Sequence, residues 1–414
     1  MSICYNEFMF KEKMNELFSG YDELLLKCFC GIFIGVSVSL CEVIFGKGLN
    51  WILSFRGKMG SIMLVGLPFA GLLIVFLFDH WGRISRKGMN LVFEVEQGKS
   101  EMIPLRMAPF MIVSTWITHL FGGSAGREGV AVQIGATISH YFGRYCRFEN
   151  SSIIFMVAGM AAGFAGLFGT PITAVFFALE VLVAGTLKYK AMPCAVPASF
   201  MATYVSSLFG LHKSTFKISC DYILTSELGV KLIFIGIVFG VVGGLFAFCL
   251  KNAKAWTQKK FVNPYKRIFV VGFMTAFLLF VLGQCRYSGV GENLIESAFS
   301  GRTIYAYDWI LKFVLTIFTL SAGFQGGEVT PLFSIGTCLG LILAPILGLD
   351  PMFTAAMGYA CVFGSATNTF LAPIAIGLEV FGYDLFPFFF IVCSIGYIVN
   401  QNESIYALQR QVRE

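Results

Sequence analysis

Two ionisable residues, Arg127 and Glu128, lie side by side in an otherwise apolar part of the chain. They belong to the glycine-rich stretch 122–130, Gly-Gly-Ser-Ala-Gly-Arg-Glu-Gly-Val. The flanking residues 104–121 and 131–142 include no Asp, Glu or Lys. Charges inside a membrane are costly to place and usually mark a path for ions or protons. Burial also favours the neutral form of a carboxyl, so Glu128 could exchange a proton near neutral pH.

A second glycine-rich stretch, residues 323–331, carries an acid at a matching position. Its sequence is Gly-Phe-Gln-Gly-Gly-Glu-Val-Thr-Pro, and its acid is Glu328. Glu180 follows Glu128 by 52 residues, and Glu379 follows Glu328 by 51 residues. This similar spacing indicates that the chain contains two related halves.

The internal repeat extends beyond the acids. Residues 134–138 resemble 335–339, and residues 168–171 resemble 363–366. Duplicated halves whose broken helices meet in the middle of the membrane are a common plan of secondary transporters, often with inverted topology. We therefore expect an all-α polytopic membrane protein with two repeated halves around a mid-membrane site.

The two glycine-rich turns could bind an anion together. A turn ahead of an apolar helix exposes backbone N–H groups, and the helix dipole adds positive potential there. The turns at 126–130 and 323–331 could therefore point two helix N-termini at one ion. Pro331 suits the first turn of the second helix, and Gly129 would let the backbone approach the ion closely.

The composition indicates a membrane protein. Apolar residues make up 57% of the 414 residues and charged residues only 13%, whereas soluble domains carry about 25% charged residues. The mean hydropathy is +0.76. Loop Lys and Arg that set the topology account for the net charge of +6, which needs no nucleic-acid partner. The twelve Cys and four His lack metal-ligand spacing, and no cofactor is implied.

We expect a single transmembrane domain, residues 24–400, between two short polar segments. Residues 1–23 form a cytoplasmic N-terminal segment that is too polar for a signal peptide, and residues 401–414 form a C-terminal segment without a regulatory domain. Within the domain, the first repeat covers residues 24–211 and the second covers residues 230–400.

Basic residues indicate the cytoplasmic side. The linker 251–267 contains six Lys or Arg and no acid, so the positive-inside rule places it in the cytoplasm. Arg83, Arg86 and Lys87 form a second basic cluster, which we expect on the same side.

Uneven apolar segments indicate broken helices. A spanning helix needs about 20 residues, but residues 131–142 are fewer, and the segments 153–187 and 352–381 are long and interrupted by glycine. Helices can end inside a membrane only where their ends line a site. The predicted apolar segments are residues 24–45, 62–78, 104–121, 131–142, 153–187, 192–211, 232–250, 268–282, 309–324, 332–349, 352–381 and 385–399.

These motifs carry a resemblance to a known family. Residues 126–130 resemble the GREGP motif of the CLC family of anion channels and anion/proton antiporters, and residues 327–331 resemble its GxFxP motif. The acids Glu180 and Glu379 match its Leu-Glu helix endings, and Tyr406 falls where the family has its central anion-site tyrosine. The resemblance implies a CLC-type fold, a homodimer with one ion path per subunit, and a gating role for the glutamate of the first motif.

Departures from the usual family pattern indicate which clade of the family the chain resembles. The anion-coordinating serine expected near residue 88 is replaced by Met89-Asn90, the proline of GREGP is Val130, and the position of the inner proton-relay acid is Val181. An additional acid, Glu328, enters the second motif. This combination resembles the fluoride/proton antiporter clade and implies a multi-pass protein of the cell membrane, such as a bacterial inner membrane, that exports fluoride in exchange for protons.

The substitutions suit fluoride chemically. Fluoride is small and strongly hydrated, so it needs several compact donors in place of its water, and hydrogen bonds to a charged acceptor are strong. Met89 could narrow the site against chloride. Met89 and Val329 could equally be packing residues, Thr330 could cap its helix, and Asn90 could serve a loop. The candidate anion-binding residues are Met89, Asn90, Gly129, Val130, Val329, Thr330 and Tyr406.

Glu328 requires a separate hypothesis. A second negative charge in an anion path repels the anion, unless Glu328 is protonated much of the time or alternates with the ion and with Glu128. Two coupled carboxyls titrate as a unit, and the pair would supply a proton route without the inner relay acid. Alternatively, Glu128 could serve only as an ion-pair partner of Arg127 or Arg144.

Other functions stay open from the sequence. A chloride/proton antiporter or a passive anion channel would share the fold, and an unrelated transporter of organic anions could also have repeated halves. Residues 122–126 also fit the GxSxG pattern of serine hydrolases, with His119 or His140 as the base for Ser124, although no orienting acid lies nearby. We expect a transporter and not an enzyme.

Overall fold

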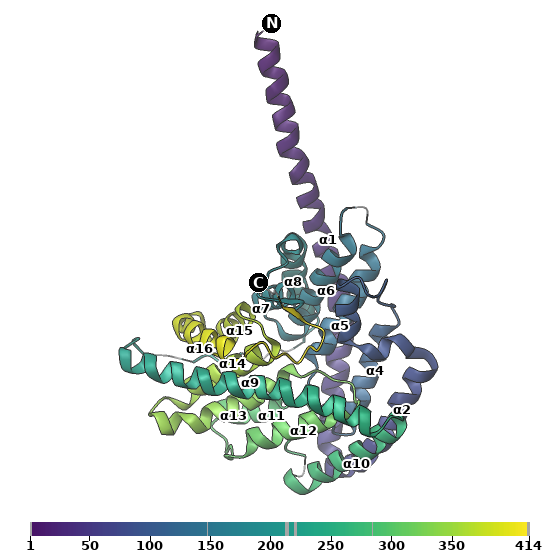
Figure 1. The fold of residues 1–414 in the computed structure, drawn as a ribbon, viewed down its shortest axis with the longest axis vertical. Helices are drawn as coiled ribbons and strands as arrows, with labels where there is room; N and C mark the ends of the chain where they lie inside the picture. The colour runs from purple at the N-terminus through teal and green to yellow at the C-terminus, as the bar shows by residue number, and fades with distance from the viewer. Residues whose placement is uncertain (1, 147, 212–214, 219–221, 284, 412–414) are drawn as a thin grey trace.

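The computed structural model describes residues 2–146, 148–211, 215–218, 222–283 and 285–411, with side chains from Tyr21 onward. These residues form sixteen α-helices and a two-stranded parallel sheet, and Figure 1 shows a helical body beyond which α1 extends. The elements are α1 (Ser2–Met59), α2 (Leu67–Leu77), α3 (Met89–Glu96), α4 (Met107–Leu120), α5 (Glu128–Gly143), α6 (Ser151–Phe168), α7 (Pro171–Glu180), β1 (Val183–Ala184), α8 (Met192–Leu208), α9 (Ser226–Lys260), α10 (Pro264–Gly283), α11 (Glu292–Phe299), α12 (Asp308–Ala322), α13 (Val329–Leu347), α14 (Pro351–Thr367), α15 (Leu371–Phe381), α16 (Phe386–Val399) and β2 (Arg410–Gln411).

The first helix is longer than predicted. We expected a polar segment over residues 1–23 and an apolar helix over residues 24–45, but α1 runs unbroken through both and continues beyond them. The helix contains no proline, and its Gly35 packs tightly: a Cβ there would lie 2.5 Å from the carbonyl oxygen of Ala198 in α8. Small residues of this kind allow membrane helices to approach closely.

The basic linker is mostly helical. The sequence suggested a loop over residues 251–267, but α9 and α10 leave only residues 261–263 outside a helix. Lysine is a good helix former, and its long side chain reaches water from the end of a membrane helix. A run of lysines therefore marks the side of the membrane but does not end the helix.

The two long apolar segments break as expected. α6 and α7 divide residues 153–187, and α14 and α15 divide residues 352–381. Gly169 ends α6 with a φ of 75°, and Asn368 ends α14 with a φ of 53°. Both φ angles lie in the left-handed region that commonly terminates helices. The pairs α6–α7 and α14–α15 are thus equivalent parts of the two repeats.

Each repeat caps a helix of the other repeat. The carboxylate of Glu379 in α15 accepts hydrogen bonds from two N–H groups at the start of α7, at 2.8 and 2.9 Å. The carboxylate of Glu180 in α7 accepts bonds from two N–H groups at the start of α15, at 2.7 and 2.9 Å. Such reciprocal contacts are what a two-fold relation between equivalent parts produces. The two Leu-Glu endings therefore join the halves.

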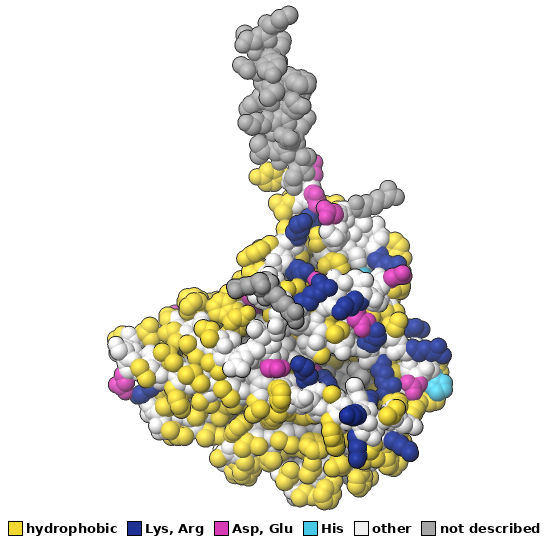
Figure 2. Space-filling model, viewed as in Figure 1, with side chains coloured by type: hydrophobic (Ala, Val, Ile, Leu, Met, Phe, Trp, Pro, Cys, Tyr) yellow, Lys and Arg dark blue, Asp and Glu magenta, His cyan; other side chains and the backbone are white. Residues whose placement is uncertain are grey.

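The surface and the helix lengths fit a multi-pass membrane protein. Five described stretches are long and apolar enough to cross a membrane, and four shorter apolar helices accompany them. Figure 2 shows hydrophobic side chains covering the face over α9, α13 and α16. The predicted all-α membrane fold is confirmed.

Candidate functional site

The two glycine-rich turns bond directly to each other. The N–H of Gly126 donates to the carbonyl oxygen of Gly327, and the N–H of Gly327 donates to that of Gly126 at 2.7 Å. A Cβ on Gly327 would lie only 2.8 Å from the backbone nitrogen of Gly129, so the approach requires glycine. The bridge brings the N-termini of α5 and α13 together, as the sequence predicted.

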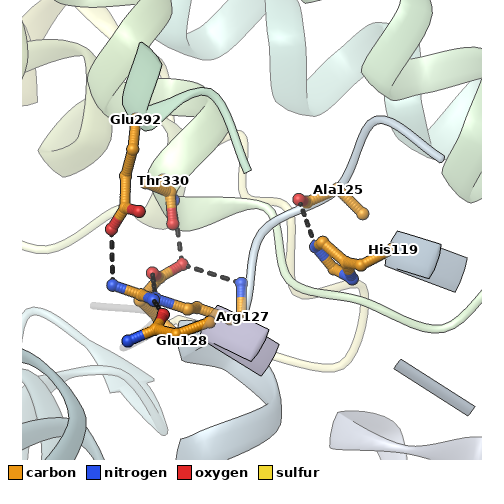
Figure 3. A network of polar contacts seen from close by, with 7 residues as sticks. His119, Ala125, Arg127, Glu128, Glu292 and Thr330 are labelled. Carbon is orange, nitrogen blue, oxygen red and sulfur yellow. Dashed lines mark hydrogen bonds and ion pairs between the residues drawn. The ribbon is translucent and has the colours of Figure 1, made fainter. Parts of the chain in front are cut away.

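Glu128 is fully buried at the start of α5, and its carboxylate faces the start of α13. Its Oε2 accepts hydrogen bonds from the backbone N–H groups of Thr330, at 3.0 Å, and Arg127, at 3.1 Å (Figure 3). The carboxylate therefore occupies a position in which a small anion could accept hydrogen bonds from the same N–H groups. Its Oε1 has no hydrogen-bond partner among the described residues.

The Arg127 side chain links this carboxylate to other elements. Its Nε lies 3.6 Å from Oε1 of Glu128, while the guanidinium pairs with Glu292 at 2.5 Å and bonds to Asn50 of α1 at 3.3 Å. Arg144, the other cation considered for Glu128, instead contacts a methionine sulfur. Sequence reasoning missed Glu292 because a partner 165 residues away leaves no local spacing signal.

A cavity of about 440 Å³ opens beside the turns, and we call it the basic cavity. Residues of both predicted basic clusters line it, so the two clusters lie next to each other. Cations around an opening raise the local concentration of anions. Its lining includes the cations Arg83, Arg86, Lys87, Lys254 and Arg267, and the predicted site residues Met89, Asn90, Glu328 and Tyr406.

Glu328 lines the basic cavity as the residue that precedes α13. Its carboxylate pairs with Lys254 of α9 at 3.2 Å. This pairing offsets the repulsion that a second acid would exert on an anion, and the sequence did not reveal it. A Cβ on Gly129 would lie 3.7 Å from Oε2 of Glu328, so this acid lies close to the turn that carries Glu128.

The predicted donors of the two helix ends occupy first turns. Gly129 and Val130 of α5, and Val329 and Thr330 of α13, are all buried. The first N–H groups of a helix generally have no partner within it; here the N–H of Val130 donates to the carbonyl oxygen of Arg127 at 3.2 Å, and that of Thr330 donates to Glu128. The hydroxyl of Thr330 has no hydrogen-bond partner among the described residues, so it does not form the helix cap that the sequence suggested. The hydroxyl is therefore available to an anion.

Met89 and Asn90 form the first turn of α3 beside the basic cavity. Asn90 is exposed and Met89 half-buried. Sequence reasoning missed Gln133 of α5, which also lines the cavity and whose buried Oε1 has no partner among the described residues. A Cβ on Gly88 would lie 3.2 Å from that oxygen. As the only carboxamide in residues 131–142, Gln133 could have been noticed.

The C-terminal segment carries Tyr406 into the body. The Tyr406 ring lies near Phe93 of α3 and Phe177 of α7, with ring centroids 5.6 and 6.5 Å apart. The N–H of Ile405 donates to the carbonyl oxygen of Ala366 at 2.9 Å, and β2 pairs with β1. These contacts hold the tyrosine at the basic cavity.

The arrangement required of a serine hydrolase is not formed. Both ring nitrogens of His119 lie at hydrogen-bond distance from backbone carbonyl oxygens, at 2.8 and 3.0 Å, and His140 bonds to a serine hydroxyl of α6. Ser124 instead contacts Lys312, with its Oγ 3.0 Å from the lysine nitrogen. Among the described residues neither histidine bonds to Ser124, so the structure does not support this alternative.

Comparison with known proteins gives a consistent set of relatives. Residues 70–401 match a family model described as voltage gated chloride channel. A chloride/fluoride channel protein of Pseudomonas syringae pv. tomato is 35% identical over 359 residues, which cover 83% of this chain and 77% of the relative. The H(+)/Cl(-) exchange transporter ClcA of Klebsiella pneumoniae is 25% identical over 391 residues, covering 85% of this chain and 80% of the relative.

Solved structures show the same fold. A crystal structure described as a CLC-type fluoride/proton antiporter is 48% identical, with a TM-score of 0.93 over 95% of this chain and 99% of that chain. A slow cyanobacterial Cl−/H+ antiporter is 18% identical and shares the fold, with a TM-score of 0.79 over 91% of this chain and 94% of that chain.

Proposed function

The chain belongs to the voltage gated chloride channel family, and we propose that it is a secondary active transporter that exchanges fluoride for protons. The observation that carries the proposal is the position of Glu128, whose carboxylate binds the N–H of Thr330 at the start of the opposite helix. An anion that enters from the basic cavity competes with this carboxylate for the same helix ends. Occupation by one excludes the other.

In this proposal Glu128 is both gate and proton carrier. A protonated Glu128 loses its charge and therefore its attraction to the Thr330 N–H and to Arg127. It then leaves the helix ends, and an anion can bind there. After the proton is released, the carboxylate returns and expels the anion. Each passage of an anion is thereby linked to the movement of a proton.

The donors around the gate support fluoride as the anion. Fluoride forms short, strong hydrogen bonds to compact donors, and the hydroxyl of Thr330, the amide of Asn90 and the phenol of Tyr406 are of this kind. Glu328, with its charge compensated by Lys254, serves in the proposal as a second proton-transfer group. The 48% identical fluoride/proton antiporter gives this choice of ion further support.

The experiment is a flux assay on purified protein in liposomes. We expect a fluoride gradient to drive protons against their own gradient and an equal chloride gradient to drive far fewer. Fluoride flux without proton movement would indicate a passive channel, and equal coupling with chloride would indicate a chloride/proton antiporter.

We further propose that the protein acts as a homodimer in the cell membrane, a bacterial inner membrane, where it exports fluoride. Each subunit holds its own gate, since the residues of the proposed site come from one chain. Light scattering of the purified protein in detergent distinguishes a dimer from a monomer.

A further inference from the structure

Arg127 lies between two carboxylates and one amide from different elements. Its Nε faces Glu128 of α5 at 3.6 Å, one terminal nitrogen pairs with Glu292 of α11, and the other bonds to Asn50 of α1. Figure 3 shows Glu292 and Glu128 approaching the guanidinium together. The Arg127 side chain is 11% exposed, Glu128 is not exposed, and Glu292 is 31% exposed.

The contact between Arg127 and Glu128 is incomplete. The separation of 3.6 Å exceeds hydrogen-bond distance, and both Nε of Arg127 and Oε1 of Glu128 are buried without a hydrogen-bond partner among the described residues. Buried polar atoms normally find partners. A small movement of the guanidinium would join these two atoms, and its short ion pair with Glu292 opposes that movement.

We infer that Glu292 is a positioning residue that holds Arg127 away from Glu128 and so keeps the gate free to leave the helix ends. The inference rests on the proposed gating role of Glu128. Without the charge of Glu292, the guanidinium has one carboxylate partner left and closes on Glu128. The charged, closed gate is then more stable, and more acid is needed to protonate and open it.

Other charged or titratable side chains lie around Arg127, Glu128 and Glu292. Lys312 of α12 contacts the residues that precede α11: its Nζ donates to the carbonyl oxygen of Gly289 at 2.8 Å, and a Cβ on Gly291 would lie 2.9 Å from its Cε. Tyr359 of α14 interacts electrostatically with Glu128, Glu292 and Arg127. Glu328 lies beside the first turn of α5. Among the described residues Arg127 pairs with two carboxylates, those of Glu128 and Glu292, so removal of the Glu292 charge strengthens the remaining attraction of the cation for Glu128.

The test measures proton-coupled fluoride exchange against pH in liposomes for the wild type, Glu292→Gln and Glu292→Asp. We expect Glu292→Gln to move the half-maximal rate about half to one pH unit towards acid, with a rate about threefold to tenfold lower at neutral pH and an unchanged number of protons per fluoride. Glu292→Asp keeps the charge and should restore most of the rate. The matched control is Glu296→Gln, one turn along α11. The Glu296 side chain is 58% exposed, and its ion pair with Arg302 is long, at 4.0 Å.

A double-mutant cycle tests whether Glu292 acts through Arg127. In an Arg127→Gln background, Glu292→Gln should shift the profile by less than half as much as in the wild type. An unshifted profile for Glu292→Gln, or a full shift in that background, would overturn the inference. Absence of coupled exchange in the wild type would instead refute the proposed function. Thermal unfolding of each variant separates a folding defect from a change in gating.

Discussion

The reciprocal caps between the repeats predict a large stability loss for Glu379→Ala. The Glu379 carboxylate accepts the N–H of Ile172 at 2.9 Å, and the N–H and hydroxyl of Thr173 at 2.8 and 2.6 Å. Removal of the side chain leaves all three donors at the start of α7 without this acceptor. It also removes a negative charge from a helix N-terminus, where negative charge is favourable.

The magnitude follows from these three bonds. A hydrogen bond to a charged group contributes about 1.5–3 kcal/mol, but Glu379 is only partly buried, so water can replace part of the loss. We therefore expect a decrease of about 3–5 kcal/mol in the free energy of unfolding. With the unfolding entropy of a chain of 414 residues, this corresponds to a fall of about 3–6 °C in Tm.

Thermal unfolding in detergent, followed by intrinsic fluorescence, measures the effect. Glu180→Ala should produce a similar fall, because Glu180 caps α15 in the same way. The control is Glu227→Ala, whose side chain is 78% exposed and, within the described part of the chain, pairs only with Lys231 on the same helix. The reasoning is refuted if Glu379→Ala lowers Tm no more than Glu227→Ala does.

Two further substitutions test the meeting of the helix ends. Gly327→Ala should abolish exchange, because a Cβ would lie 2.8 Å from the nitrogen of Gly129. The control is Gly229→Ala, since a Cβ at Gly229 would have nothing within 4 Å. Normal exchange by Gly327→Ala would contradict the geometry. Thr330→Val should weaken fluoride affinity about tenfold or more through loss of one donor to a charged ion. Thr337→Val removes another buried hydroxyl of α13 that has no hydrogen-bond partner in the described part of the chain, and it should leave the affinity unchanged. Equal effects of the two substitutions would argue against a fluoride contact at Thr330.

The sequence predicted the parts of the site that have local signals. Glycine-rich turns, an acid within apolar sequence and the matched intervals to Glu180 and Glu379 all follow from short motifs, and the structure brings these motifs together. The resemblance to the CLC family is confirmed by the family match and the solved structures. The assignment of individual anion-binding residues stays a prediction.

The site features that the sequence did not predict depend on contacts between residues far apart in the chain. The pairing of Glu328 with Lys254 and that of Arg127 with Glu292 join residues far apart in the chain. Helix ends were also missed where no residue breaks the helix, as in α1 and at residues 251–260 of α9. Local propensity does not mark a helix end where good helix formers such as lysine continue the helical sequence.

The most direct test of the central claim is fluoride-driven proton uptake by Glu128→Gln, compared with the wild type in the same liposomes. Glutamine keeps the size of the side chain but cannot carry a proton. We predict that proton uptake disappears, whether the fluoride flux is blocked or continues uncoupled. Proton uptake at the wild-type rate in Glu128→Gln would contradict the assignment of Glu128 as gate and proton carrier.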